Sequence, residues 1–151
     1  KADKSPANDL FITPHSGEAA NLLGVDVPAI EADRLNAGTQ LAQRYACNVV
    51  VKGPGSVVVT QEGTQICAHG GPAMATAGMG DVLSGICAGL LAPLYASGDQ
   101  GAVCEQFSQA VALHSASADL AAQLLGPRSV MATDVTAKIP SVLSGKTQPD
   151  D

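Results

Sequence analysis

Positively charged and aromatic side chains are scarce in this sequence. Its 151 residues include no Trp, two Tyr, two Phe, and 8 Lys and Arg against 14 Asp and Glu, which gives a formal charge of −6. Nucleic-acid affinity comes mostly from Lys and Arg that neutralise phosphates, so this balance argues against a nucleic-acid partner. No Lys or Arg lies between Lys52 and Arg128. Any anion bound by that stretch must therefore be held by backbone N–H groups.

Patterns typical of metal or disulfide frameworks are absent as well. The four cysteines, at positions 47, 67, 87 and 104, lie in apolar segments and form no C-x-x-C pair, so we interpret them as buried thiols. No apolar run reaches the roughly 20 residues that span a bilayer, and residues 1–10 contain no apolar stretch typical of a signal peptide. We therefore expect a cytoplasmic protein without a membrane partner.

The remaining composition is typical of one globular domain. Apolar residues make up 46% of the sequence. A chain of this length buries about 70% of the surface that its unfolded form exposes, which is enough for a core without a metal or a disulfide. We expect this domain to occupy residues 1–143. The polar segment 144–151 is typical of a disordered tail.

The apolar spacing in the first third of the chain predicts an α/β fold. Residues 10–13 form a short apolar strand, and the segment after Pro14 has helical spacing up to Gly24. An amphipathic helix is predicted over residues 28–46. Three valines at 49–51 then follow without alternation, as in a strand covered on both faces of a parallel sheet. This order of strand, helix and strand is typical of a β-α-β unit.

The rest of the chain predicts an antiparallel pair of strands followed by helices. The β-rich runs 57–60 and 65–69 flank a hairpin turn at residues 61–64. A glycine-rich loop without regular structure follows over residues 70–80. Three helices come after it, over residues 81–93, 99–125 and 133–143. Gly85 and Gly89 lie four apart on the first of these helices, and we expect them to pack closely against another backbone.

The sharpest chemical feature is the segment Gly78-Met79-Gly80-Asp81. Two glycines let successive amides turn inward, and the following helix adds its positive end, so together they predict an anion hole. Asp81 lies beside this hole as a candidate general base for a substrate hydroxyl next to a transferring phosphoryl group. Capping of the helix by Asp81 is an equally good interpretation of the same pattern.

A second candidate is the loop Lys52-Gly53-Pro54-Gly55-Ser56, which leaves the predicted buried strand. Ligands of open α/β sheets bind outside the carboxyl ends of the strands, so this loop is placed to cradle a nucleotide. A glycine and proline turn with a solvated Lys52 is the simpler alternative. The spacing is not that of a G-x-x-x-x-G-K-[ST] loop, so a P-loop nucleotide hydrolase is not supported.

A third candidate is the segment 13–18, TPHSGE, again between a strand and a helix. His15 is placed to donate to a substrate oxygen, and Glu18, one turn away, to orient water around Mg²⁺. The alternative is that Glu18 only complements the helix dipole. We interpret His69 and His114 as structural residues.

The segments TPHSGE, KGPGS and GGPAMATAGMGDVLSG follow one another in this order. With them the sequence resembles, over nearly its whole length, the ADP- or ATP-dependent NAD(P)H-hydrate dehydratases of the ribokinase-like superfamily. The resemblance implies an α/β fold, the ribokinase-like three-layer α/β/α architecture, of which this chain is the C-terminal part. It also implies an enzyme that restores NADH or NADPH from its hydrate: the nucleotide phosphorylates the ring hydroxyl, and phosphate then leaves.

The same resemblance implies roles for the candidate residues. Asp81 would be the base that contacts the hydrate, and His15 a second hydrate contact. Residues 52–56 and 78–80 would bind ADP or ATP, and Glu18 would help to organise Mg²⁺. Because the family's domain has a substantial part before TPHxGE, we expect a missing N-terminal portion or a second copy of the chain, in a homo-oligomer, to complete the sheet. Two other functions compete: a small-alcohol kinase of the same superfamily and a catalytically silent nucleotide-binding module.

Overall fold

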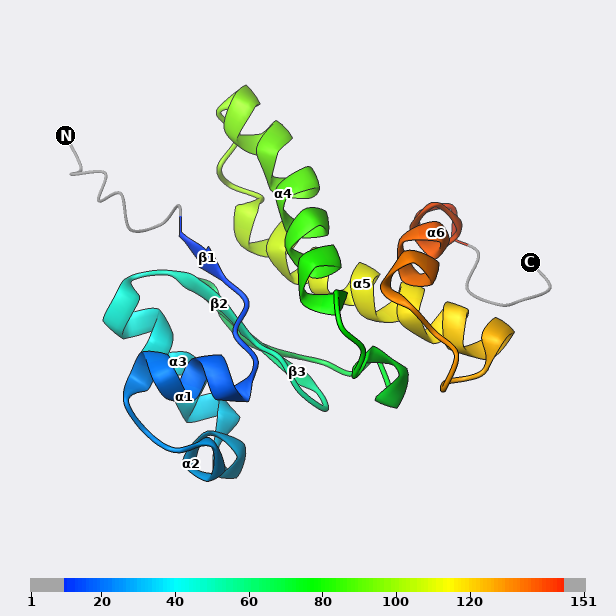
Figure 1. Cartoon of the computed structure of the whole chain (residues 1–151). Coiled ribbons are helices and arrows are strands. Elements are labelled where there is room, and N and C mark those ends of the chain that lie inside the picture. The colour runs from blue at the N-terminus through cyan, green and yellow to red at the C-terminus, as the bar shows by residue number, and fades with distance from the viewer. Residues whose placement is uncertain (1–9, 146–151) are drawn as a thin grey trace. The chain divides into compact units, whose positions relative to one another are not determined.

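A computed structural model describes residues 10–145 of the chain, which Figure 1 shows as a ribbon. The chain divides into two compact units, an N-terminal unit that ends at Ile66 and a C-terminal unit that begins at Cys67. Of the predicted tail 144–151, only Ser144 and Gly145 lie among the described residues, where they form a turn. The rest of that prediction falls outside the described residues.

The N-terminal unit contains a four-stranded sheet with the strand order β1-β2-β3-β4. Its strands are β1 (Phe11–Ile12), β2 (Asn48–Val51), β3 (Ser56–Thr60) and β4 (Gly63–Cys67). β1 runs parallel to β2, whereas β3 runs antiparallel to β2. The sheet is therefore mixed, as a β-α-β unit followed by a hairpin predicts. β4 begins earlier than expected because its turn contains only Gln61 and Glu62.

Three helices pack against one face of this sheet: α1 (Ser16–Leu23), α2 (Val27–Ala32) and α3 (Arg34–Tyr45) (Figure 1). Their shared core consists of Ala19, Ala20, Ile30, Ala37, Leu41, Cys47, Val49, Val51, Val57 and Val59. Val50 points to the opposite face of the sheet and is also fully buried. β2 is thus covered on both sides, as its unbroken run of valines predicts.

The single helix predicted over residues 28–46 is wrong, because the chain breaks it at Asp33. The backbone of Asp33 (φ −151°, ψ 78°) is not helical, and its carboxylate accepts the N–H of Asn36 at 2.9 Å. Asp is a strong N-cap residue, and here the cap overrides the continuous apolar spacing on which the prediction rested. The break places Glu31 in α2 and Arg34 at the start of α3.

The C-terminal unit is helical. It contains a 3₁₀ turn, η2 (Pro72–Met74), and the helices α4 (Met79–Ser97), α5 (Val103–Leu125) and α6 (Ala132–Leu143). One apolar cluster joins these elements and consists of Ala73, Met79, Ala118, Ala121, Val130 and Val135. The three predicted helices are confirmed with changed bounds: α4 begins before Asp81 and continues past Pro93, and α5 begins at Val103 instead of Asp99. The glycine-rich loop, predicted to have no regular structure, contains the η2 turn.

α4 leaves much of its apolar surface uncovered. By length and composition it could cross a membrane, contrary to the prediction that no segment could, and only 22% of its most apolar window is buried. Beside it lies an apolar groove of about 400 Å³, lined by Val82, Gly85, Ile86, Gly89, Leu90, Leu113, Thr136, Ile139 and Leu143. Apart from the helix's own backbone, no described atom lies within 4 Å of a Cβ built at Gly85 or Gly89. The close backbone packing predicted there is therefore not found among the described residues.

All four cysteines are free thiols. Cys47 and Cys87 are buried, as predicted, whereas Cys67 and Cys104 are only half-buried. Burial raises the pKa of the Cys47 thiol, and it raises the pKa of Cys87 to about 11. Both remain thiols at neutral pH and act as small apolar core residues.

Gly38 lets α3 approach the sheet closely. A Cβ at this position would lie 2.9 Å from Cγ2 of Val59. Gly38→Ala therefore overpacks the core at a cost of about 1–3 kcal/mol, against a gain of about 1 kcal/mol in helix propensity. Gly85→Ala, at an open position of α4, gains the propensity without the clash. We expect urea unfolding of the 151-residue chain to find Gly38→Ala less stable than Gly85→Ala by roughly 1–3 kcal/mol. Equal stabilities would contradict this account of the packing.

Candidate functional site

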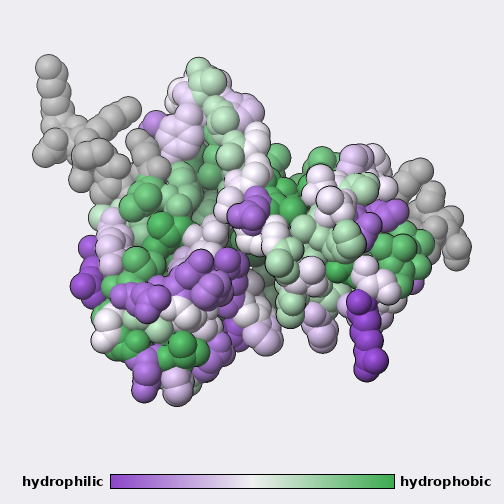
Figure 2. Space-filling view, in the orientation of Figure 1, coloured by the Kyte–Doolittle hydropathy of each residue, from purple (hydrophilic) through white to green (hydrophobic). Residues whose placement is uncertain are grey.

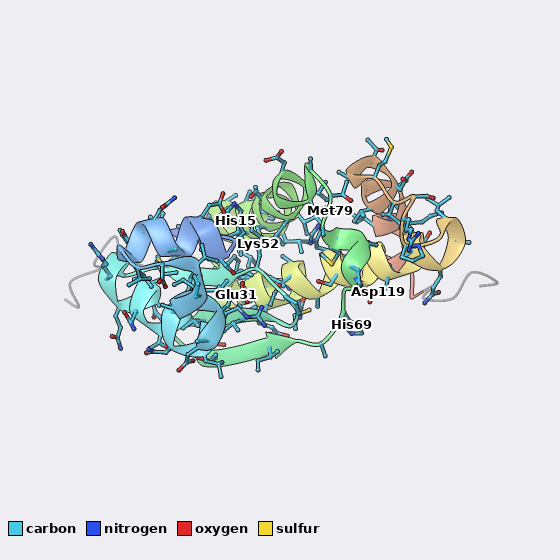
Figure 3. All side chains as sticks on the ribbon, turned by 60° about the horizontal axis from the view of Figure 1, so that its bottom comes forward. His15, Glu31, Lys52, His69, Met79 and Asp119 are labelled. Carbon is cyan, nitrogen blue, oxygen red and sulfur yellow. The ribbon has the colours of Figure 1, made fainter. Side chains whose placement is uncertain are left out.

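The parallel strands β1 and β2 end with two of the candidate segments side by side. The N–H of Lys52 donates to the carbonyl of Pro14 at 2.8 Å, and His15 and Lys52 form an isolated parallel bridge. Figure 3 shows the two labelled side chains next to each other, and Figure 2 shows hydrophilic side chains gathered over α1. Residues 13–18 and 52–56 thus form one polar surface, here called the strand-end surface, where an open α/β sheet binds its ligands.

The helix α1 fixes the imidazole of His15. Nδ1 accepts the N–H groups of Gly17 and Glu18 at 3.1 and 3.2 Å. In the neutral ring the proton must then lie on Nε2, which is 3.5 Å from Oε1 of Glu18. Because the side chain is 60% exposed, Nε2–H can donate to a bound molecule, the role that the sequence analysis gave to His15.

Glu18 completes the cap of α1. Its Oε2 accepts the N–H of His15 at 2.7 Å and lies 3.7 Å from Nζ of Lys52. The His15 N–H, more than the charge of Lys52, holds the pKa of Glu18 below its usual range. The structure thus contains the helix-terminal carboxylate that was the alternative interpretation of Glu18. Across residues 10–145, no three His, Cys, Asp or Glu side chains gather as a metal cluster.

The loop 52–56 is braced by hydrogen bonds of its own. Ser56 closes it by donating from Oγ to the carbonyl of Gly53 at 3.3 Å, and Gly55 turns it with a φ of +66°. Lys52 pairs with Glu18 and is only 25% exposed, so the alternative of a solvated lysine is wrong.

The loop is also held by Arg34, a residue that the sequence analysis missed. Its Nη2 donates to the carbonyl of Pro54, and its side chain is 18% exposed. In the sequence, Arg34 and Glu31 read as the polar face of one long helix. The guanidinium reaches the loop because the helix breaks at Asp33. Arg34 and Pro54 are far apart in the sequence, so no local pattern predicts their contact.

In the C-terminal unit, two hydrogen bonds hold the glycine-rich loop, and Gly78 turns it. The N–H of Gly70 donates to Oδ2 of Asp119 on α5 at 2.9 Å, and Oγ1 of Thr76 lies 3.5 Å from the carbonyl of Val130. Gly78 has a φ of +88°, and a Cβ there would lie 3.1 Å from the first side chain of α6. These contacts shape the approach to α4 without any cation.

The two histidines of this unit lie apart from the start of α4. Nδ1 of His69 lies 3.9 Å from Oδ2 of Asp119, and its ring is 63% exposed (Figure 3). His114 is 4% exposed in the middle of α5. The buried position of His114 fits the structural role expected from the sequence, and the structural role of His69 stays a prediction. Asp119, which anchors the loop, was missed because an acidic residue on a long helix usually only faces solvent.

The N-terminus of α4 carries amide donors without a partner. Gly78 is the N-cap and has no side chain that could accept a hydrogen bond. The N–H of Met79 lies 3.4 Å from the carbonyl of Thr76, whereas the N–H groups of Gly80 and Asp81 make no hydrogen bond to residues 10–145. A helix start leaves such donors unpaired and places the positive end of its dipole behind them, so this end can bind an anion.

Asp81 lies exposed in the first turn of α4. Its carboxylate makes no cap hydrogen bond to α4, so helix capping, the competing interpretation of this residue, is not found. A carboxylate next to unpaired amide donors combines a proton acceptor with an anion site. The structure brings His15, Glu18 and the loop 52–56 together in the N-terminal unit. Residues 78–81 are a second candidate site, in the C-terminal unit.

Comparison with solved structures defines the class of fold. The chain aligns over 92% of its length with 45% of a ribokinase-like superfamily protein from Enterococcus faecalis V583, with a TM-score of 0.71 and 27% identity. It aligns over 90% of its length with 48% of the ADP/ATP-dependent NAD(P)H-hydrate dehydratase from Bacillus subtilis, co-crystallised with ATP/Mg²⁺ and soaked with CoA, with a TM-score of 0.78 and 25% identity. The fold is α/β and ribokinase-like, as the resemblance implied.

Sequence comparison then defines the family. Residues 2–141 match the model of the NAD(P)H-hydrate dehydratase family, and the chain belongs to this family. It is also similar to the bifunctional NAD(P)H-hydrate repair enzyme Nnr of Vibrio cholerae, with 41% identity over 134 residues. That match covers 89% of this chain and 26% of the relative. The chain thus spans about a quarter of the length of the curated relatives that it matches.

Glu18→Gln should make the stability of the chain less sensitive to acid. The pKa of Glu18 is lowered from 4.5 on folding, so its charge stabilises the fold above that value, and the contribution is lost as pH falls through the lowered pKa. Urea unfolding should show a difference between wild type and Glu18→Gln that is constant above about pH 5.5 and shrinks at lower pH. Glu62→Gln, on the exposed turn before β4, is the charge-matched control. A difference that grows on acidification would argue against the cap.

Proposed function

We propose that the protein carrying this chain restores NADH or NADPH from its hydrate, with ADP or ATP as the phosphoryl donor. The observation that carries the proposal is the pair of unpaired amides at Gly80 and Asp81, next to the Asp81 carboxylate. Amides at a helix start can bind phosphate oxygens without a cation, and no Lys or Arg lies between Lys52 and Arg128. Membership in the NAD(P)H-hydrate dehydratase family supports the choice of substrate.

The proposed reaction has two steps. Asp81 takes the proton of the ring hydroxyl while the hydroxyl oxygen attacks the terminal phosphorus of the nucleotide. The leaving group is AMP when ADP is the donor, and ADP when ATP is the donor. The lone pair of the ring nitrogen then expels phosphate, and loss of a proton from the neighbouring carbon re-forms the ring double bond. The amides of residues 78–81 hold the phosphoryl oxygens while charge moves to the leaving oxygen.

The remaining candidate residues receive binding roles in this proposal. Nε2–H of His15 donates to the hydrate, and the loops 52–56 and 78–80 each contact the adenine nucleotide. Mg²⁺ bound with the nucleotide would neutralise phosphate charge. Oε2 of Glu18 already faces the His15 N–H and Lys52, so Glu18 fits a contact to Mg²⁺ through water better than direct coordination.

We also propose that residues 1–143 are one portion of a catalytic domain, and that the remainder of that domain covers the apolar face of α4. The chain matches 48% of the B. subtilis structure and 26% of the V. cholerae relative, which leaves ample further sequence for this purpose. Burial of apolar area stabilises by about 25 cal/mol per Å², and the bare backbone at Gly85 and Gly89 accepts a close neighbour. A helix covered by protein rather than lipid also agrees with a cytoplasmic location.

Turnover by the natural protein at its full length tests the proposed reaction. Hydrated NADH or NADPH is incubated with ADP or ATP, and return of the dihydronicotinamide absorbance is followed together with release of phosphate. We expect both to occur in equal amounts. Phosphate transfer to a small alcohol without that absorbance would identify a kinase instead, and calorimetric binding of ADP without turnover would identify a silent module.

Asp81→Asn should abolish most turnover and spare nucleotide binding. Asparagine keeps the size of the side chain but cannot take up the hydroxyl proton, so kcat should fall by roughly 100-fold or more. The dissociation constant of ADP, measured by calorimetry, should stay near the wild-type value because the backbone amides remain. Asp99→Asn, an exposed change in the same unit, is the matched control. An unaltered kcat in Asp81→Asn would remove the proposed base.

Gly85→Leu should distinguish the chain alone from the full-length protein. In the 151-residue chain no described atom outside the backbone of α4 lies within 4 Å of a Cβ at this position, and the groove of about 400 Å³ that Gly85 lines leaves room for the rest of the side chain, so the change should cost little. In the full-length protein it should overpack the interface with the rest of the domain, at about 1–3 kcal/mol in thermal or urea unfolding. Equal effects in both proteins would contradict the proposed cover. A stable dimer of the 151-residue chain that Gly85→Leu disrupts would assign the face to a second copy.

A further inference from the structure

We propose that Arg34 is a positioning residue that holds the loop 52–56 in place and ties it to the start of α1. The role rests on the proposed function in so far as that loop contacts the nucleotide. Arg34 lies outside all three segments that the sequence analysis singled out, and its contacts arise from the break between α2 and α3.

A continuous series of side-chain contacts runs from α1 to the loop. Oγ of Ser16 donates to Oε1 of Glu31, and Oε2 of Glu31 lies 3.9 Å from Nε of Arg34. Nη2 of Arg34 then donates to the carbonyl of Pro54. Ser16 follows His15 directly, so the series joins the two segments of the strand-end surface.

The guanidinium is packed under the loop and does not extend into solvent. The Arg34 side chain is 18% exposed, and its Nη1 is buried with no hydrogen-bond partner among the described residues. A Cβ built at Gly53 would fall on Nη1 and lie 3.0 Å from Cζ. Gly53 thus has no side chain because the guanidinium fills that space, whereas Gly55 is the residue of the loop that needs a positive φ.

Besides the backbone bond from the Lys52 N–H to the Pro14 carbonyl, two side-chain connections join the segments of the strand-end surface. The pair between Lys52 and Glu18, at 3.7 Å, involves a half-exposed carboxylate and is screened by water. The pair between Arg34 and Glu31, at 3.9 Å to a carboxylate that is 49% exposed, is screened in the same way. Arg34 differs because its guanidinium, which is 18% exposed, also donates a charge-assisted hydrogen bond to the backbone carbonyl of Pro54 inside the loop. We therefore assign the positioning of the loop to Arg34.

Amide hydrogen exchange in the 151-residue chain tests this assignment without any nucleotide. Arg34→Gln should raise the exchange rates of the Gly53 amide, which donates to Oγ of Ser56 at 3.4 Å, and of the Ser56 amide by about tenfold. The amides of β2 should keep their protection because their ladder bonds to β1 and β3 remain. Arg44→Gln is the matched control: Arg44 also lies on α3 and donates to a backbone carbonyl, that of Leu23 at 3.2 Å. It should leave the loop amides unchanged.

Gly53→Ala tests the same contact from the loop side. The added methyl group must displace the guanidinium, so this variant should reproduce the exchange pattern of Arg34→Gln. Once the guanidinium is gone the methyl group has room, so the double variant should exchange no faster than either single variant. Additive effects would show that Gly53 and Arg34 act independently and would overturn the proposal.

Kinetics of the full-length protein test the functional part. Arg34→Gln should raise the KM for ADP or ATP about tenfold, with kcat within about twofold of wild type and the KM for the hydrate unchanged. Arg34→Lys keeps the positive charge but loses the planar guanidinium with its several N–H donors, so it should recover only part of the affinity for the nucleotide. A nucleotide KM equal to that of the wild type, or loop amides that exchange as in the wild type, would each overturn the role of Arg34. If the wild type neither binds nor converts nucleotide, the proposed function fails, and the exchange experiment alone decides whether Arg34 orders the loop.

Discussion

The parallel pairing of β1 with β2 is the constraint on which the strand-end surface depends. Parallel strands end at the same edge of a sheet, so the residues that follow each strand become neighbours although more than thirty positions separate them in the sequence. The bond from the Lys52 N–H to the Pro14 carbonyl extends that pairing into both segments. The contact of Glu18 with Lys52 follows from it, whereas the cap made by His15 and Glu18 is local to the start of α1.

In the proposed function, the C-terminal unit binds an anion without a positively charged side chain. Its donors are backbone amides, and amides bind well only when the backbone is held in one shape. The loop before α4 is held by Asp119, which accepts the N–H of Gly70, and by the bond from Thr76 to the carbonyl of Val130. Residues distant in the sequence thus hold the backbone that carries the proposed site.

Predictions from the local sequence were confirmed where one strong signal determined the local structure. The valine run of β2, the glycine that ends α1 and the donors before Asp81 were all predicted, because each depends on a few neighbouring residues. Predictions failed where two local signals competed. The apolar spacing over residues 28–46 favoured one helix, but the capping carboxylate of Asp33 ended it. At Asp81 the sequence left a cap and a base open, and the structure shows that the carboxylate makes no cap bond.

By itself, the sequence determined the α/β class, most of the elements, the segments that carry polar chemistry and the resemblance to a family. Those features depend on periodicity, turn chemistry and short motifs, which act over a few residues along the chain. Only the tertiary structure decided that Arg34 reaches Pro54, that Asp119 anchors Gly70 and that Lys52 faces Glu18. Such contacts join residues far apart in the sequence, and the packing of whole elements selects them, so no local pattern can encode which pairs meet.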